Sequence, residues 1–447
     1  MLRTHGAKEP KTSVAIIGGG YAGMAAAVTL AANGVRCVVF EAGRSLGGRA
    51  RRIEYRGEVI DNGQHILAGA YTELLRLMRL VEVPDSALRR VPLRLSMPPE
   101  FLLSAPRNVL LQGSAYLGWT LLATKGLRFS EKLAAIRFMR SLRRSKFKVD
   151  ASASVATLLA QHKQPRNLID HLWQPLTISA LNTPLSDASA QVFANVLRDS
   201  LASNREASDL LLPCIDLTAL FPDPASSWIT ARGSEVRTSA RVSGILAFEN
   251  QYCVSCNGEP QRFDSVILAV GPHQLDGLML DIAAPSLKYE PIVTIYFRFE
   301  QPIQLPEPML GQTRGFAQWF FDRRALNTNC SLLTDGSGLI AAVISASGPH
   351  QLLSQDDLAD RVFVELSAHV PGLPAPLWRK VVSEKFATFA CTTNADRPPV
   401  HTNHSGVFRS GDYVAGKYPA TLEGAVRNGV KAAEASLTYL QSIEALK

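Results

Sequence analysis

The sequence predicts an α/β protein built around a parallel sheet, and three observations support this fold class. Residues 14–17 and 35–40 are short β-branched runs of the kind that forms buried parallel strands. An alanine-rich helical segment at 24–33 joins these two runs, and Gly34 ends it. A strand pattern at 406–409, far along the chain, leads into a second helical segment, so both ends of the chain are expected in one domain.

Composition limits the classes of protein that fit this chain. It has 447 residues, of which 46% are hydrophobic, and a formal net charge of +8, which is typical of a globular protein with two or three domains. A net positive charge is compatible with binding to a nucleic acid, an anionic cofactor or an anionic membrane. No zinc-finger spacing, basic zipper or RNA-binding signature occurs in the sequence, so no nucleic-acid partner is expected.

Cysteine usage and the N-terminal residues predict a cytoplasmic protein. Six scattered cysteines are too few for a disulfide framework, and the CxxC at Cys253 and Cys256 lies on an expected hairpin strand without a second pair, so no metal site is expected. Residues 1–12 contain no apolar run, so no secretory signal is expected. The uncharged stretch at 108–124 is too short to span a membrane.

A glycine cluster between the first strand and helix indicates dinucleotide binding. Gly18, Gly20 and Gly23 have the spacing GxGxxG, in which the first glycine permits a tight turn, the second lets a pyrophosphate approach and the third lets the helix lie close to the strand. The helix N-terminus attracts phosphate, and Glu41, at the end of the second strand, can accept hydrogen bonds from a ribose.

The residues after Glu41 change the expected type of dinucleotide. Instead of a helix and a third strand, the chain continues Ala42, Gly43, Arg44 and then Gly47, Gly48, Arg49, so a second loop should close over the cofactor. Arg44 and Arg49 can meet a phosphate or a flavin carbonyl. This combination resembles the flavin monoamine oxidase and carotenoid desaturase superfamily, which implies a Rossmann-like FAD-binding domain of the glutathione-reductase-like type.

The superfamily resemblance implies further cofactor contacts. Gly411 and Asp412 follow the late strand, and Asp412 would bind the ribityl chain or pyrophosphate. The helix that opens near Thr421 and Leu422 would point its positive end at the flavin N1 and C2 carbonyl. Val242 would contact the adenine through its backbone.

The predicted FAD-binding domain is therefore discontinuous, with residues 1–79, 206–279 and 396–447. Residues 80–205 and 280–395 are expected to form an α+β substrate domain with a helical subdomain in its first part. Helices are expected near 74–81, 155–159 and 356–369, a hairpin at 245–256, and strands at 262–270, 292–299 and 339–345. Core packing is the favoured role of the aromatic run at 319–321.

A basic segment at 132–148 has two open interpretations. Its apolar residues occur at near-helical spacing among many lysines and arginines, without an acid. Such a segment is either a helix that binds an anionic membrane surface peripherally or the solvated face of a helical subdomain.

Three longer strings resemble one family within the superfamily. They are DNGQHILAGAY from Asp61, PLTISALNTPLSDASAQVFANVLRDSL from Pro175 and YPATLEGAVRNG from Tyr418. They are similar to the bacterial hydroxysqualene dehydroxylases, also called squalene-associated FAD-dependent desaturases. The resemblance implies that reduced FAD delivers a hydride to hydroxysqualene, that water leaves, and that squalene enters hopanoid synthesis, with a functional link to squalene-synthase-like enzymes.

The reaction needs a proton donor for the leaving hydroxyl group, and three residues are candidates. His65 and Asp61 come first because their segment should reach the flavin, and Tyr418 is the third because it precedes the flavin-facing helix. A turn role for Asp61 and a structural role for His65 remain open. The alternative functions are an isoprenoid desaturase of the squalene or phytoene type and an amine oxidase.

Overall fold

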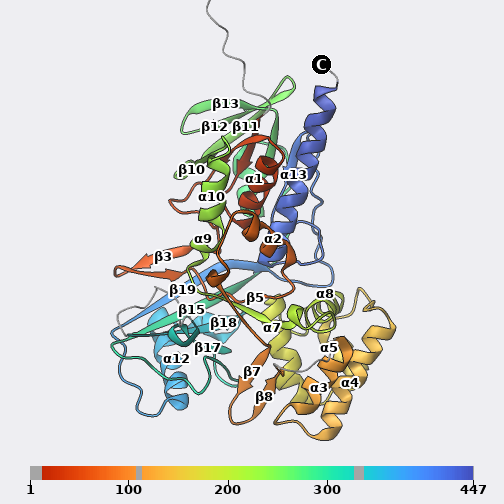
Figure 1. Cartoon of the computed structure of the whole chain (residues 1–447), viewed down its shortest axis with the longest axis vertical. Coiled ribbons are helices and arrows are strands. Elements are labelled where there is room, and N and C mark those ends of the chain that lie inside the picture. The colour runs from red at the N-terminus through yellow and green to blue at the C-terminus, as the bar shows by residue number, and fades with distance from the viewer. Residues whose placement is uncertain (1–12, 107–112, 327–336, 446–447) are drawn as a thin grey trace, which may run out of the picture.

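The protein is described by a computed structural model that covers residues 13–106, 113–326 and 337–445 (Figure 1). One layer is a five-stranded parallel sheet with strand order β10-β2-β1-β14-β20. Its strands come from the beginning, middle and end of the chain: β1 (Ser13–Ile17), β2 (Arg36–Phe40), β10 (Glu235–Arg237), β14 (Ser265–Leu268) and β20 (Val407–Arg409). The discontinuous α/β sheet expected from the sequence is present, while the exact domain boundaries stay a prediction.

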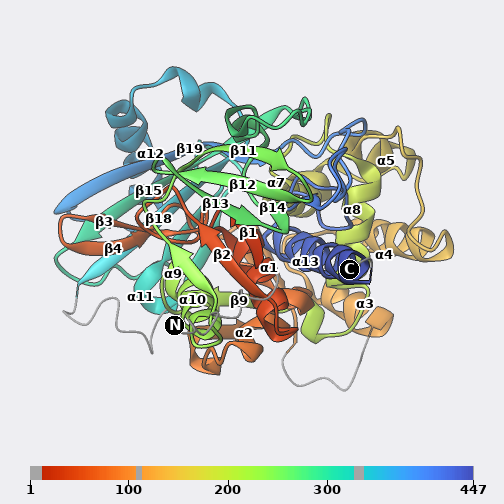
Figure 2. The ribbon, with the colours of Figure 1, turned by 90° about the horizontal axis from the view of Figure 1, so that it is seen from above.

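Two helices cover one face of this sheet. Helix α1 (Tyr21–Ala32) lies beside α13 (Leu422–Glu444), as Figures 1 and 2 both show. A Cβ atom on Gly429 would lie 2.2 Å from the carbonyl oxygen of Ala22, so only glycine allows this close approach of the two helices. The opposite face is covered by an antiparallel sheet of β11 (Val242–Phe248), β12 (Gln251–Cys256) and β13 (Glu259–Phe263).

A second large sheet lies below the first in Figure 1 and has the order β16-β17-β18-β15-β19. The expected strands at 292–299 and 339–345 are β15 (Tyr289–Phe299) and β18 (Gly338–Ser345), with β16 (Met309–Gly311), β17 (Trp319–Asp322) and β19 (Trp378–Phe389) beside them. Helix α12 (Gln355–His369) covers one face. The aromatic side chains of β17 are buried, which confirms core packing for the run at 319–321.

The remaining part is mostly helical, as expected, and is placed at the lower right of Figure 1. Its main helices are α3 (Gly113–Ala123), α4 (Phe129–Arg144), α5 (Val155–Gln161), α7 (Gln174–Leu181) and α8 (Ala190–Val196). Three short strands were not expected from the sequence: β6 (Leu88–Val91), β7 (Arg94–Met97) and β8 (Phe101–Ser104). Helix α2 (Thr72–Leu80) confirms the helix expected near 74–81.

The prediction of one strand at 262–270 was wrong. Arg262 and Phe263 end β13, and a new strand, β14, begins at Ser265. Asp264 makes the break, because its carboxylate accepts hydrogen bonds from the amide of Ser13 at 2.9 Å and from Gln251 Nε2 at 3.0 Å. These contacts hold Asp264 between two strands that belong to different sheets.

The helix predicted by the basic segment is present, but its apolar side is not free. Phe138, Met139 and Leu142 of α4 are buried in the core of the helical part. This burial favours the second interpretation, the solvated face of a helical subdomain, for the helix itself. No helix within the described ranges is both long and apolar enough to cross a membrane. The segment 1–12, where no signal was expected, and residues 108–112 lie outside the described residues.

Candidate active site

The turn between β1 and α1 contains the three motif glycines, and two of them are required by packing. Gly18 has a φ of +109°, and a Cβ atom there would lie 2.5 Å from the carbonyl oxygen of Ala269. A Cβ atom on Gly23 would lie 1.9 Å from the carbonyl oxygen of Gly18. A Cβ atom on Gly20 would make only ordinary contacts, with Gly48 at 3.7 Å and Gly47 at 3.9 Å, so the protein's own packing does not explain that glycine.

The backbone amides in the first turn of α1 are not capped by a side chain of the described residues. The N-cap of this helix is Gly20, and its first turn contains no acidic residue. The first turn is nevertheless buried, with Tyr21 only 3% exposed. A buried helix N-terminus without a cap needs another partner, and an anionic phosphate suits both its amides and its dipole.

Glu41 stands at the end of β2 and closes the turn. Its Oε2 accepts the amide of Gly19 at 2.7 Å, and its Oε1 accepts the amide of Gly43 at 2.7 Å. A carboxylate has about four acceptor positions, so two remain for a ligand hydroxyl. The carboxylate is thereby held beside the glycine turn, in the place that the sequence analysis expected.

The second glycine loop lies against the first. The amide of Gly47 donates to the carbonyl of Gly19 at 2.9 Å, and Arg49 extends from this loop to Asp412, with its Nη2 atom 2.5 Å from Oδ1. Asp412 is 6% exposed, and its partner Arg49 also donates to the carbonyl of Ala387 at 2.8 Å. The N-terminal loop and the C-terminal segment thus meet through one ion pair.

The same aspartate lies next to the start of α13. The amide of Ala420 donates to the carbonyl of Asp412 at 3.4 Å. Thr421 is the N-cap of α13, since its side chain accepts the amide of Gly424, and Leu422 is the first helical residue. Gly411 directly before Asp412 has a φ of +152°, which favours glycine. The structure therefore brings Asp412 and the α13 N-terminus together.

The remaining predicted cofactor residues lie at the edge of this region. Val242 begins β11 and is 8% exposed, and its segment is tied to the turn because the amide of Ala240 donates to the carbonyl of Glu41 at 2.8 Å. Ala42 and Arg44 are exposed on the loop after β2. Their contact with a cofactor stays a prediction.

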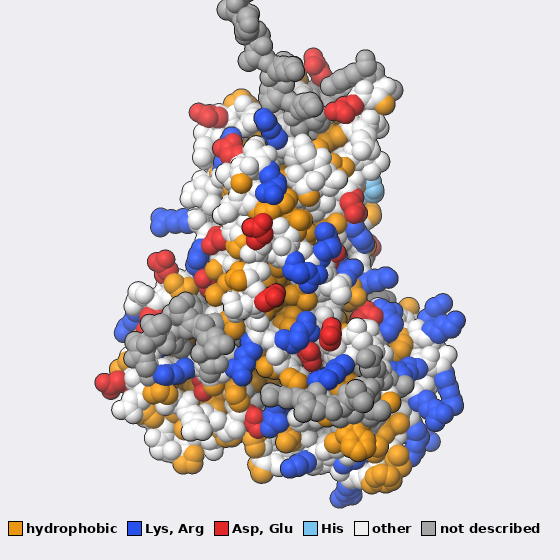
Figure 3. Space-filling view, viewed as in Figure 1, with side chains coloured by type: hydrophobic (Ala, Val, Ile, Leu, Met, Phe, Trp, Pro, Cys, Tyr) orange, Lys and Arg blue, Asp and Glu red, His pale blue; other side chains and the backbone are white. Residues whose placement is uncertain are grey.

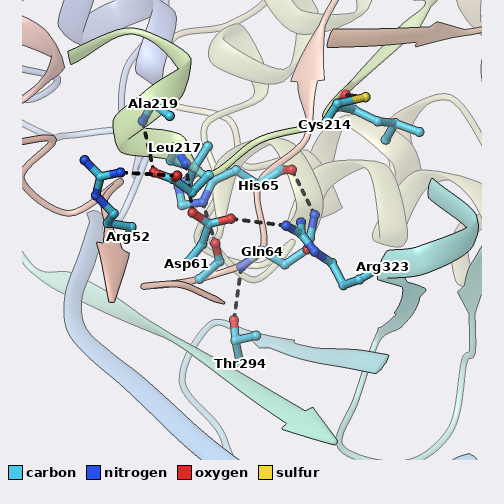
Figure 4. Close-up of polar contacts among 12 residues, drawn as sticks. Arg52, Asp61, Gln64, His65, Cys214, Leu217, Ala219, Thr294 and Arg323 are labelled. Atoms are coloured by element: carbon cyan, nitrogen blue, oxygen red, sulfur yellow. Dashed lines mark hydrogen bonds and ion pairs between the residues drawn. The ribbon is translucent and has the colours of Figure 1, made fainter. Parts of the chain in front are cut away.

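A buried polar network lies between the two large sheets and contains the first candidate acid (Figure 4). Asp61, at the end of β4 (Glu58–Asp61), is 2% exposed; its Oδ1 accepts the amide of Leu217 at 2.9 Å and its Oδ2 lies 3.4 Å from Arg323 Nη2. Arg323 Nη1 also donates to Gln64 Oε1 at 2.7 Å. Burial raises the pKa of Asp61 to about 6, although the charge of Arg323 opposes the rise.

His65 follows this network in the chain and is half-buried. Its Nδ1 atom lies 2.9 Å from the carbonyl of Gly63, so Nδ1 carries the proton and donates it, and Nε2 is left as the second, titrating nitrogen. Burial lowers the pKa of His65 below its usual range, and the charges of Arg49 and Arg323 lower it further. His65 is therefore mainly neutral at pH 7.

Tyr418 lies in a different environment from Asp61 and His65. Its hydroxyl bonds to the Asp199 carboxylate, and Arg427 lies over its ring, 4.9 Å from the centroid. Burial and the charge of Asp199 raise the pKa of Tyr418. It lines a surface groove of about 500 Å³ between α2 and α13. No hydrogen bond within the described residues joins Tyr418 to His65 or Asp61.

The comparison with protein families decides the class of this site. The model of the flavin-containing amine oxidoreductases matches residues 21–437, which is most of the chain. The chain belongs to this family. Its cofactor is FAD, and it is an FAD-dependent oxidoreductase, as the superfamily resemblance implied.

Curated relatives of this flavin-dependent chain cover nearly its full length. It is 29% identical over 449 residues to a hydroxysqualene dehydroxylase of Zymomonas mobilis, covering 95% of this chain and 99% of that protein. A hydroxysqualene dehydroxylase of Rhodopseudomonas palustris is 27% identical, covering 94% of this chain and 97% of that protein. The zeta-carotene desaturase of Arabidopsis thaliana is 23% identical, covering 95% and 85%.

A solved structure confirms the fold of this family member. An oxidoreductase of Methanosarcina mazei superposes with a TM-score of 0.73 at 17% identity and covers 94% of this chain and 100% of its own. At this identity the likeness concerns the fold alone.

The residues present fit FAD as the cofactor. The uncapped α1 N-terminus suits the pyrophosphate, and Gly20 leaves space in front of it that a Cβ atom would fill. Glu41 has acceptor capacity for a ribose, and the N-terminus of α13 lies beside Asp412. Each of these features stands at a position that the motifs predicted.

Two long-range contacts around the candidate site were missed by the sequence analysis. Arg323 stabilises the Asp61–His65 segment from 262 positions away in the sequence, and no motif surrounds it. Glu423, which is fully buried, accepts the amides of Glu73 at 2.9 Å and Leu74 at 3.0 Å and thereby caps α2 from α13. A signal for Glu423 existed, because an acid in the first turn of an apolar helix is a buried charge that needs a partner.

Proposed function

We propose that this protein converts hydroxysqualene to squalene by FAD-dependent reductive dehydroxylation. The observation that carries the proposal is the likeness to hydroxysqualene dehydroxylases over about 95% of the chain at 27–29% identity. The zeta-carotene desaturases are less similar, at 22–24% identity over comparable lengths. The glycines and acids that the FAD motifs require, Gly18, Gly20, Gly23, Glu41 and Asp412, are all present in the sequence.

The chain's own residues would hold the cofactor in a fixed place. In this proposal the α1 amides and Gly18, Gly20 and Gly23 surround the pyrophosphate, and Glu41 binds the ribose. The remaining contacts to FAD are assigned to Ala42, Arg44, Gly48, Arg49, Val242, Gly411, Asp412, Thr421 and Leu422. When bound in reduced form, FAD supplies the hydride from N5.

The leaving hydroxyl needs a proton, and His65 is the first candidate to give it. Because Nδ1 is committed to the Gly63 carbonyl, a proton taken up by this residue resides on Nε2 and is available to a substrate oxygen. Loss of the hydroxyl group as water would consume this proton, and the bound reduced cofactor would supply the one hydride that forms the new C–H bond. Asp61 and Tyr418 remain the second and third candidates.

The contacts of Asp61 support a positioning role more than direct proton transfer. Both carboxylate oxygens are occupied, by the Leu217 amide and the Arg323 guanidinium. The hydrogen bond from Arg323 to Gln64 then fixes the position of Gln64, the neighbour of His65 in the chain. Such a rigid environment keeps a proton donor oriented toward its substrate.

An anaerobic experiment tests the proposal. The bound flavin is reduced without oxygen, hydroxysqualene is added, and both squalene and the flavin spectrum are followed. The proposal expects squalene to appear as the flavin is reoxidised. If no squalene forms and added squalene instead reduces the oxidised flavin, the protein is a desaturase; reduction by amines would indicate an amine oxidase.

The substrate and product also define the proposed setting of the enzyme. Both are long apolar molecules that dissolve in bilayers, so a cytoplasmic enzyme would meet them at the inner face of a membrane. A squalene-synthase-like enzyme would supply the hydroxylated precursor.

A further inference from the structure

The turn between α3 and α4 carries an unusual group of exposed apolar side chains. Trp119 and Leu122 lie three positions apart, on one side of α3, and are 53% and 41% exposed; Phe129, the first residue of α4, is 67% exposed. The side chain of Lys132 on α4 ties the two helices together here, because its Nζ donates to the backbone carbonyl of Leu122 at 2.7 Å. We call Trp119, Leu122 and Phe129 the α3–α4 tip.

The tip is distinct from the apolar face of α4, which is buried in the protein core. Ala135, Phe138, Met139 and Leu142 are buried in the core of the helical part. The tip side chains are exposed, and Figure 3 shows hydrophobic side chains at the end of the molecule to which Figure 1 assigns α3 and α4. A group of large exposed apolar side chains marks an interaction site.

The surroundings of the tip are strongly basic. Residues 113–148 contain one acid, Glu131, which is 9% exposed and accepts hydrogen bonds from the Arg128 amide at 2.7 Å and from Asn167 at 3.0 Å. Its charge is therefore turned inward. The same residues contain nine cations: Lys125, Arg128, Lys132, Arg137, Arg140, Arg143, Arg144, Lys146 and Lys148. Lys and Arg side chains border the apolar group in Figure 3.

From this juxtaposition we propose that the α3–α4 tip inserts into the headgroup layer of an anionic lipid bilayer, with the surrounding cations bound to lipid phosphates. Aromatic and aliphatic side chains enter the boundary between headgroups and acyl chains, and each cation near an anionic surface adds to the affinity. The identity of the molecule that the enzyme would take from this bilayer rests on the proposed function; the docking surface does not.

A bilayer fits the tip better than an acidic protein does. The three apolar side chains are 41–67% exposed, and a fluid lipid layer closes around exposed apolar groups, whereas a protein partner would need a matching hollow. An acidic protein would satisfy the cations but would leave Phe129 and Trp119 in contact with water or charges. The two partners therefore differ in whether binding depends on the apolar residues.

Intrinsic fluorescence reports insertion directly. The other tryptophans, Trp173, Trp228, Trp319 and Trp378, are buried or half-buried, so Trp119 dominates any change caused by a new surrounding. The purified holoprotein is mixed with vesicles of phosphatidylglycerol and phosphatidylcholine in equal amounts, or of phosphatidylcholine alone. We expect a blue shift and co-sedimentation with the anionic vesicles, and quenching by lipids brominated on their acyl chains. The absence of binding to anionic vesicles would overturn the proposal.

Variants separate insertion from simple charge attraction. Leu122→Ser with Phe129→Ser should weaken vesicle binding about ten-fold or more. Arg137→Gln with Arg140→Gln should weaken it by roughly 25-fold, since each cation near the surface contributes about five-fold. Leu352→Ser is the matched control, because Leu352 is 89% exposed and lies outside the tip. Binding that survives the double serine change, and that soluble polyglutamate displaces, would replace the bilayer with an acidic protein.

Failure of the docking surface and failure of the proposed function have different signatures. The double serine variant should turn over hydroxysqualene dispersed in detergent as the wild type does, and turn over vesicle-borne hydroxysqualene several-fold more slowly. Equal loss in both assays would contradict a docking role. A wild type that binds vesicles but makes no squalene in either assay would reject the function and leave the docking surface standing.

Discussion

Arg49 and Asp412 form an ion pair of 2.5 Å across 363 positions of sequence, and this pair joins the second glycine loop to the segment that follows β20, the last strand of the parallel sheet. Asp412 is almost fully buried, whereas the Arg49 side chain is 40% exposed. Both residues belong to predicted cofactor motifs. The pair therefore connects the two ends of the chain at the place where FAD is expected.

Loss of either member of this pair should weaken FAD binding. Arg49→Gln leaves the Asp412 carboxylate buried without its cation, and Asp412→Asn removes the charge that orients Arg49. We expect the dissociation constant for FAD to rise about ten-fold or more in each variant, measured by flavin fluorescence during titration of the apoprotein. The double variant should lose less than the product of the two effects, because the residues share one contact. Unchanged FAD affinity in Arg49→Gln, alongside the surface control Arg232→Gln, would contradict this role.

Glu423 should be important for the stability of the fold around α2. It is fully buried and accepts the amides of Glu73 and Leu74, so Glu423→Ala leaves that helix N-terminus without its cap. We expect a loss of about 2–3 kcal/mol in the free energy of unfolding, measured by urea denaturation, since charged hydrogen bonds of this kind contribute that much. Glu434→Ala on the exposed side of α13 should change the free energy by less than about 0.5 kcal/mol. Equal effects of the two changes would remove the capping explanation.

The activity should depend on pH through His65 if this residue donates the proton. Burial lowers the pKa of His65, so its imidazolium form is populated only on the acid side of the usual histidine range. Turnover by the reduced enzyme should therefore rise as pH falls and level off below that pKa. In His65→Gln this rise should disappear, with turnover reduced about 10²–10⁴-fold and flavin content unchanged. The exposed His401→Gln serves as control, and a pH profile retained in His65→Gln would exclude His65 as the acid.

Asp61 should make the stability of the wild type fall with rising pH over a defined range. Its pKa in the folded protein is raised to about 6, against about 4 in the unfolded chain, so the folded state holds more protons between these values. The free energy of unfolding of the wild type, minus that of Asp61→Asn, should therefore decrease as pH rises from about 4 to about 6 and then stay constant. Chemical denaturation at several pH values measures this difference. A difference that increases over the same range would mean that Arg323 outweighs burial and lowers the pKa of Asp61.

The local parts of the fold and site could be predicted from the sequence because their determinants are neighbours in the chain. Gly18, Gly20 and Gly23 lie within six residues, and the turn they form requires glycine where a Cβ atom would strike the backbone. Glu41 directly follows the apolar run of β2, so its position at the carboxyl end of that strand could be predicted from the sequence. The motif residues therefore lie beside one another as their spacing predicted.

Contacts between distant segments were not predictable in the same way. The pairing of Asp61 with Arg323 depends on how two sheets pack, and neither residue stands in a periodic pattern that names its partner. The spacing of α4 indicated a helix with one apolar side, but not that this side is buried while the exposed apolar residues lie at the preceding turn. The break at Asp264 was missed because the residues that hold its carboxylate, Ser13 and Gln251, lie elsewhere in the chain.

Hydride transfer from reduced FAD is the central claim, and deuterium labelling tests it most directly. The N5 hydrogen of reduced flavin exchanges with solvent, so the enzyme is reduced anaerobically in D₂O and given hydroxysqualene, and the product is analysed by mass spectrometry. The account predicts squalene with a single deuterium, located on the carbon that carried the hydroxyl group, formed in step with flavin reoxidation. Squalene without deuterium, or flavin that remains reduced while hydroxysqualene persists, would contradict it.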